Sequence, residues 1–212
     1  MAYDLYVITD DALAGGLSHK EIARRAVAGG ADIVQLRDKV LGCRELVRIG
    51  REILAITKPA GALFIVNDRL DVALACGADG VHLGQEDIGP GIARQLAPAG
   101  FLIGVSVGSV AEALEAEAEG ADYVALSPVF GTPSKADAGP GHGLGRLRKI
   151  REVVKIPVLA IGGINSGNVR DVIRAGAEGV AVISAVVSAP DITVAARDLK
   201  RIIRQARQER GQ

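Results

Sequence analysis

Short apolar runs rich in Val, Ile and Leu alternate with longer amphipathic stretches rich in Ala, Glu and Arg along the whole chain. Short apolar runs bounded by turn residues are typical of buried strands, and apolar residues spaced three or four apart are typical of helices. The pattern predicts strands at 4–9, 31–37, 63–67, 80–83, 102–106, 123–127, 157–161 and 179–183. It predicts helices at 19–28, 43–56, 69–75, 91–97, 110–119, 144–153, 168–175 and 192–208.

A Gly-Ala-Asp or Gly-Ala-Glu phrase precedes several of the predicted strands, at 30–32, 77–79, 120–122 and 176–178. Glycine just past a helix adopts the left-handed conformation that ends the helix, and the small residues after it let the chain turn tightly into the next strand. Regular recurrence of this joint favours an α/β fold in which the strands close into a (β/α)8 TIM barrel. We expect a single domain over residues 1–212, with an open sheet of fewer strands as the alternative.

Polar residues gather at the carboxyl ends of the predicted strands, whereas the amino ends carry few. In a barrel the catalytic face lies at the carboxyl ends, because the loops that follow the strands meet there. This asymmetry indicates an enzyme. The residues concerned are Thr9, Asp10, Gln35, Arg37, Lys39, Asn67, Asp68, Gln85, Glu86, Asp87, Ser106, Ser127, Thr132, Ser134, Lys135, Gly162, Gly163 and Ser184.

Gln35, Arg37 and Lys39 are spaced two apart at the end of the second predicted strand, so in extended backbone they project to one face. A guanidinium and an ammonium on one face can hold a diphosphate. Asp68 and Asp87 each precede a predicted helix and fit the role of an N-cap. Because they also follow neighbouring strands, we favour a shared Mg²⁺ that neutralises the diphosphate.

Gly162 and Gly163 end the apolar seventh strand, and Ser184 follows the eighth. Glycines let backbone N–H groups approach an anion, and the last two strands of a barrel often form a phosphate site. Two separate anion sites with one Mg²⁺ indicate an enzyme that joins a diphosphate substrate to a phosphorylated one. The glycine-rich stretch 131–145 is interpreted as a loop that covers substrate, with a plain surface connection as the alternative.

Charge and composition argue against several other classes of protein. The 25 Lys and Arg residues balance 25 Asp and Glu residues, so no net field favours nucleic acid or a membrane as partner. Basic residues between 197 and 210 are interpreted as the solvated face of the last helix. Cys43 and Cys76 form no disulfide framework or metal pattern, and no apolar run is long enough to cross a membrane, so we expect a cytoplasmic protein. His82 is expected to be a core or pore-lining residue.

Several segments, in order from Tyr6 to about Ala185, resemble the thiamine phosphate synthase family. They are YVITD, VQLRDK, FIVNDRLDVALACGADGVHLGQED, IGVS, GADYVALSPVFGTPSK and IPVLAIGGIN…AGAEGVAVIS. The resemblance implies a (β/α)8 barrel that joins aminomethylpyrimidine diphosphate to thiazole phosphate, with thiamine phosphate and diphosphate as products. Its implied partners are these small molecules, and the choice between monomer and homo-oligomer stays open.

Matched position by position, the resemblance also implies binding roles. It assigns the pyrimidine diphosphate to Gln35, Arg37, Lys39, Asn67, Ser106 and Lys135, the Mg²⁺ to Asp68 and Asp87, and the thiazole phosphate to Thr132, Ser134, Gly163, Ile183 and Ser184. Cations that spread the charge of the departing diphosphate lower the barrier to its loss. We therefore expect the catalytic residues to be Arg37, Lys39, Ser106 and Lys135.

The chain departs from the family pattern at two places. Val107 and Gly108 stand where the family often has Thr-His, and one lysine follows Ser134 where two are frequent. The nearest alternative is the thiazole tautomerase branch, which typically loses the Asn-Asp pair and carries a histidine where this chain has Pro128. A phosphate-binding barrel without catalysis and an unrelated phosphosugar isomerase are further alternatives, and neither needs the full set of acidic and basic residues.

Overall fold

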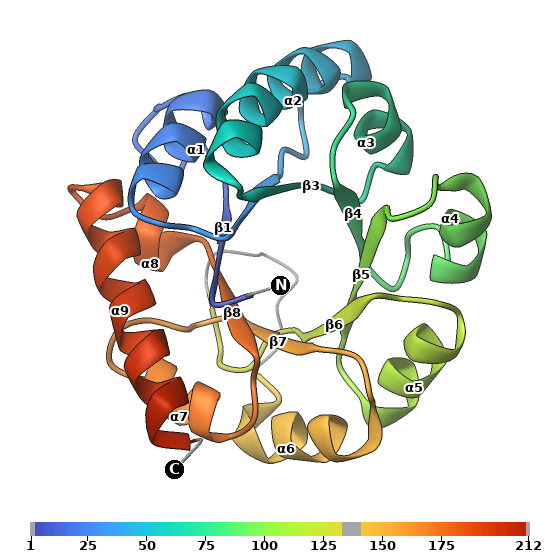
Figure 1. Cartoon of the computed structure of the whole chain (residues 1–212), viewed down its shortest axis with the longest axis vertical. Helices are drawn as coiled ribbons and strands as arrows, with labels where there is room; N and C mark the ends of the chain where they lie inside the picture. The colour runs from blue at the N-terminus through green and yellow to red at the C-terminus, as the bar shows by residue number, and fades with distance from the viewer. Residues whose placement is uncertain (1–2, 133–140, 211–212) are drawn as a thin grey trace.

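The computed structural model describes residues 3–132 and 141–210. Within them, parallel strands close into a barrel in the order β1 to β8, and helices surround it (Figure 1). The predicted (β/α)8 barrel is therefore confirmed, and the open sheet is wrong. The strands are β1 (Leu5–Ile8), β2 (Ile33–Leu36), β3 (Leu63–Asn67), β4 (Gly80–Leu83), β5 (Leu102–Val107), β6 (Tyr123–Leu126), β7 (Val158–Ile161) and β8 (Gly179–Val182).

The predicted helices all form, with ends that move by at most a few residues. They are α1 (His19–Ala28), α2 (Cys43–Thr57), α3 (Leu70–Cys76), α4 (Pro90–Leu96), α5 (Val110–Ala118), α6 (Gly143–Val153), α7 (Val169–Arg174) and α9 (Ile192–Arg210). Two short elements were not predicted, the 3₁₀ helix η1 (Lys58–Ala60) and α8 (Ser184–Val187). One turn of helix is too short to give an apolar period, so the sequence pattern carries no signal for them.

The recurrent Gly-Ala-Asp joint has the predicted backbone and a second function. Its glycines adopt positive φ, for example 92° at Gly30 and 91° at Gly120. The aspartate that follows then accepts a hydrogen bond from a backbone N–H of the preceding strand: Asp32 from Leu5, Asp79 from Phe64 and Asp122 from Ile103. These carboxylates tie neighbouring strands together at the amino end of the barrel.

Among the described residues, side chains fill the barrel interior. The interior cluster includes Tyr6 and Tyr123, which are buried. The Tyr123 ring lies over Gly104 of β5, where an added Cβ would lie only 2.0 Å from Tyr123 Cζ. Such contact leaves no room for any side chain at position 104.

Helix α9 lies in the outer ring of helices and packs beside α1 and α7 (Figure 1). The expected solvated basic face is confirmed only in part: Arg197 and Arg201 are exposed, whereas three other basic residues have acidic partners outside the helix. Lys200 pairs with Asp32, and Arg204 and Arg207 both pair with the buried Asp4. These charges therefore hold the helix to the barrel.

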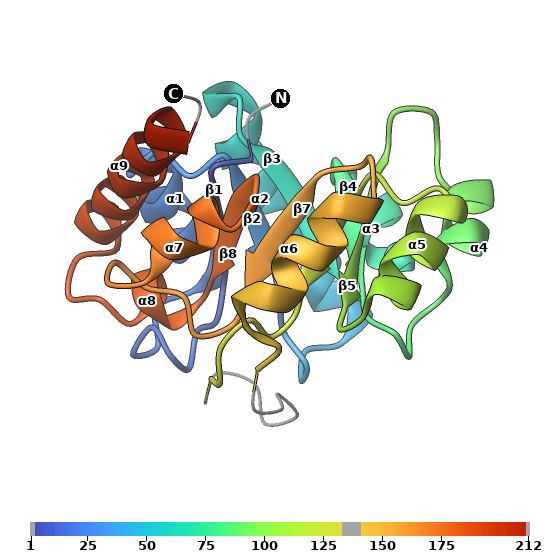
Figure 2. The ribbon, with the colours of Figure 1, turned by 90° about the horizontal axis from the view of Figure 1, so that it is seen from below.

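Figure 2 shows both termini at one end of the barrel and the chain that follows β6 at the other. Because β6 runs away from the termini, its end marks the face where the loops after the strands meet. Among the described residues, no helix is both long and apolar enough to cross a membrane.

Candidate active site

A cavity of about 410 Å³ opens at the carboxyl ends of the strands. Most residues singled out from the sequence line it together, although they come from loops spread over the whole chain. Ser134 and Lys135, and residues 133–140 of the predicted covering loop, lie outside the described residues. The residues with an implied binding role in the cavity wall are Arg37, Lys39, Asn67, Asp68, Asp87, Ser106, Thr132, Gly163, Ile183 and Ser184. The other strand-end residues singled out from the sequence that line it are Gln85, Glu86, Ser127 and Gly162.

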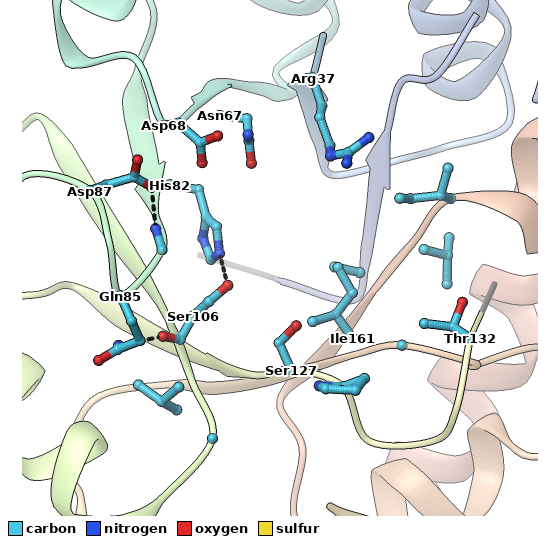
Figure 3. Close-up of a pocket in the computed structure, with 18 of the residues that line it drawn as sticks. Arg37, Asn67, Asp68, His82, Gln85, Asp87, Ser106, Ser127, Thr132 and Ile161 are labelled. Carbon is cyan, nitrogen blue, oxygen red and sulfur yellow. Dashed lines mark hydrogen bonds between the residues drawn. The ribbon is translucent and has the colours of Figure 1, made fainter. Parts of the chain in front are cut away.

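Asp68 and Asp87 lie on the same wall of the cavity, after β3 and β4 (Figure 3). Burial raises the pKa of the Asp87 carboxyl, and the charge and hydrogen bonding of Asp68 raise that pKa further. The N-cap alternative is wrong for both residues, because α3 begins after Arg69 and α4 after Gly89, without a side-chain cap hydrogen bond. The Asp87 carboxylate instead accepts a hydrogen bond from Gly84 N at 2.7 Å.

Asp68 has a left-handed backbone, with φ of 61°, and it is the only residue other than glycine with positive φ in the described ranges. Its N–H donates to the His82 carbonyl at 2.8 Å, which fixes this conformation at the junction of β3 and β4. Strained backbone of this kind persists where the surrounding structure enforces it, and it is concentrated at functional sites.

The two cations sit in the loop after β2, because the strand ends at Leu36 and not at the predicted position 37. Both nevertheless line the same cavity, although the extended strand on which the prediction rested ends before them. Arg37 Nη1 lies 3.5 Å from Asp10 Oδ2, and Lys39 Nζ lies 2.9 Å from Asp68 Oδ2. Each cation thus has an acidic partner, and of the two partners Asp68 also lines the cavity.

Gln35 is placed differently from these two cations. It is only 1% exposed, and its Nε2 donates to the Tyr6 hydroxyl at 2.5 Å. It is not among the residues that line the cavity. Because Gln35 belongs to the strand itself, its side chain lies within the barrel interior, and its assignment to the pyrimidine stays a prediction.

A chain of buried polar groups connects this interior with the cavity. The Tyr6 hydroxyl lies 3.3 Å from the Tyr123 hydroxyl, which in turn lies 3.1 Å from His82 Nδ1. The other ring nitrogen, His82 Nε2, lies 2.9 Å from Ser106 Oγ. Burial raises the pKa of both tyrosine hydroxyls, so they stay neutral donors and acceptors. His82, 8% exposed, lines the cavity as a pore-lining residue, and it holds Ser106 in place.

The opposite side of the cavity is built from the ends of β6, β7 and β8, with Thr132 across from Asp68 in Figure 3. Gly162 and Gly163 both have positive φ, 99° and 64°. The chain after β6 passes directly against them, so that a Cβ on Gly163 would lie 2.7 Å from the Gly131 carbonyl oxygen. Packing thus requires glycine at position 163, and the approach of an anion there stays a prediction. Ser184 lies at the exposed start of α8.

Among the polar residues of the cavity wall, Gln85 was named from the sequence without a binding role, and Glu112 was not named at all. Gln85 Nε2 donates to the Ser106 carbonyl at 2.7 Å, and Glu112 Oε2 accepts from Gly108 N at 2.8 Å. Glu112 belongs to a capping box, since Ser109 Oγ accepts from Glu112 N at 3.2 Å. The Ser-x-x-Glu spacing at the start of α5 is the sequence signal that identifies it.

Comparison with known proteins identifies the family of the chain. The sequence model of the family described as thiamine monophosphate synthase matches residues 5–186. The chain is 63% identical to the thiamine-phosphate synthase of Methanoregula boonei, over 99% of this chain and 97% of that protein. It is 61% identical to the thiamine-phosphate synthase of Methanoculleus marisnigri, over 99% of both. The solved thiamine phosphate pyrophosphorylase from Pyrococcus furiosus is similar with a TM-score of 0.89 at 48% identity, covering 96% of each chain. The chain therefore belongs to the thiamine monophosphate synthase family.

Proposed function

We propose that the protein joins aminomethylpyrimidine diphosphate to thiazole phosphate, giving thiamine phosphate and diphosphate. The observation that carries this proposal is the division of one cavity into two unlike walls. Two cations and two carboxylates, Arg37, Lys39, Asp68 and Asp87, lie on one side. The two glycines at the end of β7 and Ser184 after β8 lie on the other. Membership of the family supports the same reaction.

The carboxylate wall fits Mg²⁺, a cation that prefers oxygen ligands. Asp68 and Asp87 are close enough for the burial and charge of the pair to raise the pKa of Asp87. A divalent cation between them would relieve this repulsion, so we propose that Asp68 and Asp87 hold Mg²⁺. When bound, the ion would neutralise part of the negative charge of the diphosphate.

Arg37 and Lys39 would bind the diphosphate oxygens and stabilise the negative charge that grows as the C–O bond to the pyrimidine breaks. The aminopyrimidine carbocation that remains would be attacked by the thiazole nitrogen, whose lone pair forms the new C–N bond. Ser106, held by His82, and Asn67 would orient the pyrimidine. Lys135 and Gln35 complete this proposed set.

Thr132, Gly163, Ile183 and Ser184 would hold the thiazole phosphate, together with Ser134. Holding both substrates in one cavity turns a reaction between two molecules into a step within one complex, which lowers its entropic barrier. Positioning and electrostatics would then suffice without a covalent enzyme intermediate.

The proposal includes a cytoplasmic location, which the two free cysteines support. Cys43 is exposed and Cys76 is buried, and both are thiols. Free exposed thiols are typical of a reducing compartment.

The deciding experiment is to mix the purified protein with both substrates, with and without Mg²⁺, and to quantify thiamine phosphate and diphosphate. We expect equal amounts of the two products, formed only when both substrates and Mg²⁺ are present. Aromatisation of thiazole phosphate without coupling would instead support the tautomerase. Binding of either substrate without any turnover would support a phosphate-binding barrel. Both of these outcomes would overturn the proposal.

A further inference from the structure

The loop that carries Arg37 and Lys39 is tied to α1 through one buried histidine. His19, the first residue of α1, is 3% exposed. Its Nε2 lies 3.2 Å from Asp38 Oδ2 and its Nδ1 lies 2.8 Å from Thr9 Oγ1. The Thr9 hydroxyl in turn accepts from Arg37 N at 3.4 Å. Because Arg37 and Asp38 are adjacent in the chain, these contacts form a closed ring.

The second oxygen of Asp38 shapes the loop itself. Asp38 Oδ1 accepts from Val40 N and from Leu41 N, both at 2.7 Å. Burial alone would raise the pKa of the Asp38 carboxyl, but the hydrogen bonds from Leu41, Val40 and His19 outweigh it and lower that pKa. The carboxylate is therefore charged and fully engaged with protein donors.

The direction of Asp38 determines the directions of its neighbours. Arg37 and Lys39 line the cavity, whereas Asp38 between them does not. Because Asp38 lies between these two residues, anchoring its side chain to α1 holds the loop so that Arg37 and Lys39 face the cavity. The same anchor holds the Asp38 charge away from the place where an anion would bind.

We propose that His19 and Asp38 are positioning residues that fix Arg37 and Lys39 in the orientation needed to bind the diphosphate group. This inference rests on the proposed function, because the diphosphate role of Arg37 and Lys39 belongs to it. Neither His19 nor Asp38 lines the cavity, and both act through the two cations.

A cation site is the competing interpretation of the same residues. The ligand atoms of Asp11, His19 and Asp38 all lie within 4.8 Å of one another. However, both ring nitrogens of His19 and both carboxylate oxygens of Asp38 already have protein partners, and Asp11 is exposed. The completed ring of hydrogen bonds thus favours positioning over metal binding.

The test compares His19→Asn with His19→Gln. The side-chain amide of asparagine reaches the position of His19 Nδ1, so this variant loses the contact with Asp38. The longer side chain of glutamine places its amide at the position of Nε2, so this variant keeps that contact. We expect His19→Asn to raise the KM for the pyrimidine diphosphate, and the Kd of inorganic diphosphate measured by calorimetry with Mg²⁺, by about tenfold. The KM for thiazole phosphate should stay within about twofold, and His19→Gln should recover most of the diphosphate affinity.

Asp38→Ala, which lies in the loop, provides a second variant in case His19→Asn does not fold, and the same selective loss is expected from it. Asp11→Asn is the matched control and should bind inorganic diphosphate as the wild type does. Equal increases in both KM values with a lowered Tm would show a merely structural role. If Asp11→Asn raised the Kd of inorganic diphosphate as much as His19→Asn does, the three residues would form a cation site. Either result would overturn the proposal.

Binding of inorganic diphosphate separates this inference from the proposed function. If the wild type binds diphosphate in a His19-dependent manner but forms no product, the positioning role stands and the proposed reaction falls. If the wild type forms product and His19→Asn binds diphosphate as tightly, the positioning role falls alone. If the wild type does not bind diphosphate, both fall.

Discussion

Lys39 Nζ lies 2.9 Å from Asp68 Oδ2, so one ion pair joins the loop after β2 to the end of β3 at the cavity mouth. The Lys39 side chain is 61% exposed, and exposed pairs of this kind contribute only about 0–1 kcal/mol to stability. Exchanging this partner for a diphosphate oxygen therefore costs little. The pair keeps the ammonium near the proposed metal ligand without holding it tightly.

Asp68→Asn should lower the rate of product formation by about a hundredfold or more, because the amide cannot supply the charge that Mg²⁺ requires. Asparagine tolerates a left-handed backbone better than alanine does, so the strained turn at 61° should be retained. Initial rates measured against Mg²⁺ concentration, with Tm beside them, test this. Asp71→Asn, an exposed neighbour on α3, is the control. A wild-type rate for Asp68→Asn would show that Asp68 is not a metal ligand.

Ser184→Ala should weaken thiazole phosphate binding by the loss of one hydrogen bond, which is about 1 kcal/mol or roughly a fivefold rise in KM. The KM for the pyrimidine diphosphate should not change, because the two proposed sites lie on different walls. Steady-state kinetics with each substrate varied in turn give both constants. Ser188→Ala, at the exposed end of α8, serves as the control. An effect confined to the pyrimidine substrate would mean that the two sites are misassigned.

Gly104→Ala should destabilise the barrel by about 3 kcal/mol or more, because the new methyl group would overlap the buried Tyr123 ring. Gly145→Ala is a matched control in which the same methyl group meets no heavy atom within 4 Å. Since Gly145 lies within α6, alanine there should raise stability by up to about 1 kcal/mol. Urea unfolding followed by circular dichroism compares the two. Equal stabilities would contradict the dense interior described here.

Alkaline pH should unfold the protein through Tyr6 and Tyr123. Burial raises the pKa of both hydroxyls, so above about pH 10 the unfolded chain releases protons that the folded chain retains. The free energy of unfolding then decreases as pH rises, by about 1.4 kcal/mol per pH unit for each tyrosine. Urea unfolding between pH 9 and 11.5 measures the slope, and Tyr6→Phe should remove one tyrosine's share. Tyrosinate absorbance with a pKa near 10 for both residues in the folded protein would contradict this.

Elements defined by local pattern were predicted well from the sequence. The predicted ranges 19–28, 63–67 and 80–83 match α1, β3 and β4. Strand β2 was predicted too long, because Asp32 instead binds Leu5 N and the Arg37 N–H turns toward Thr9. Such side-chain hydrogen bonds compete with the strand ladder at its ends and leave no periodic signal.

The candidate site was predicted as a set of residues but not as a network. The two-residue spacing grouped Arg37 with Lys39, and both do line the cavity. The same spacing placed Gln35 in that group, but Gln35 donates to Tyr6 in the barrel interior. Whether a strand residue faces the packed interior or the open mouth depends on its height in the closed barrel, which spacing does not encode. The His19–Asp38 contact likewise joins segments that share no motif.

The barrel closes where β1 pairs with β8, so the first strand to be synthesised is the last to gain its second neighbouring strand. Leu5 pairs with Val180, and Asp4 binds Arg204, 200 positions away. While the chain emerges from the ribosome, β1 therefore presents one open edge until β8 and α9 arrive. Open strand edges are where chains pair wrongly. The nascent chain is accordingly exposed to mispairing for almost the whole time of its own synthesis.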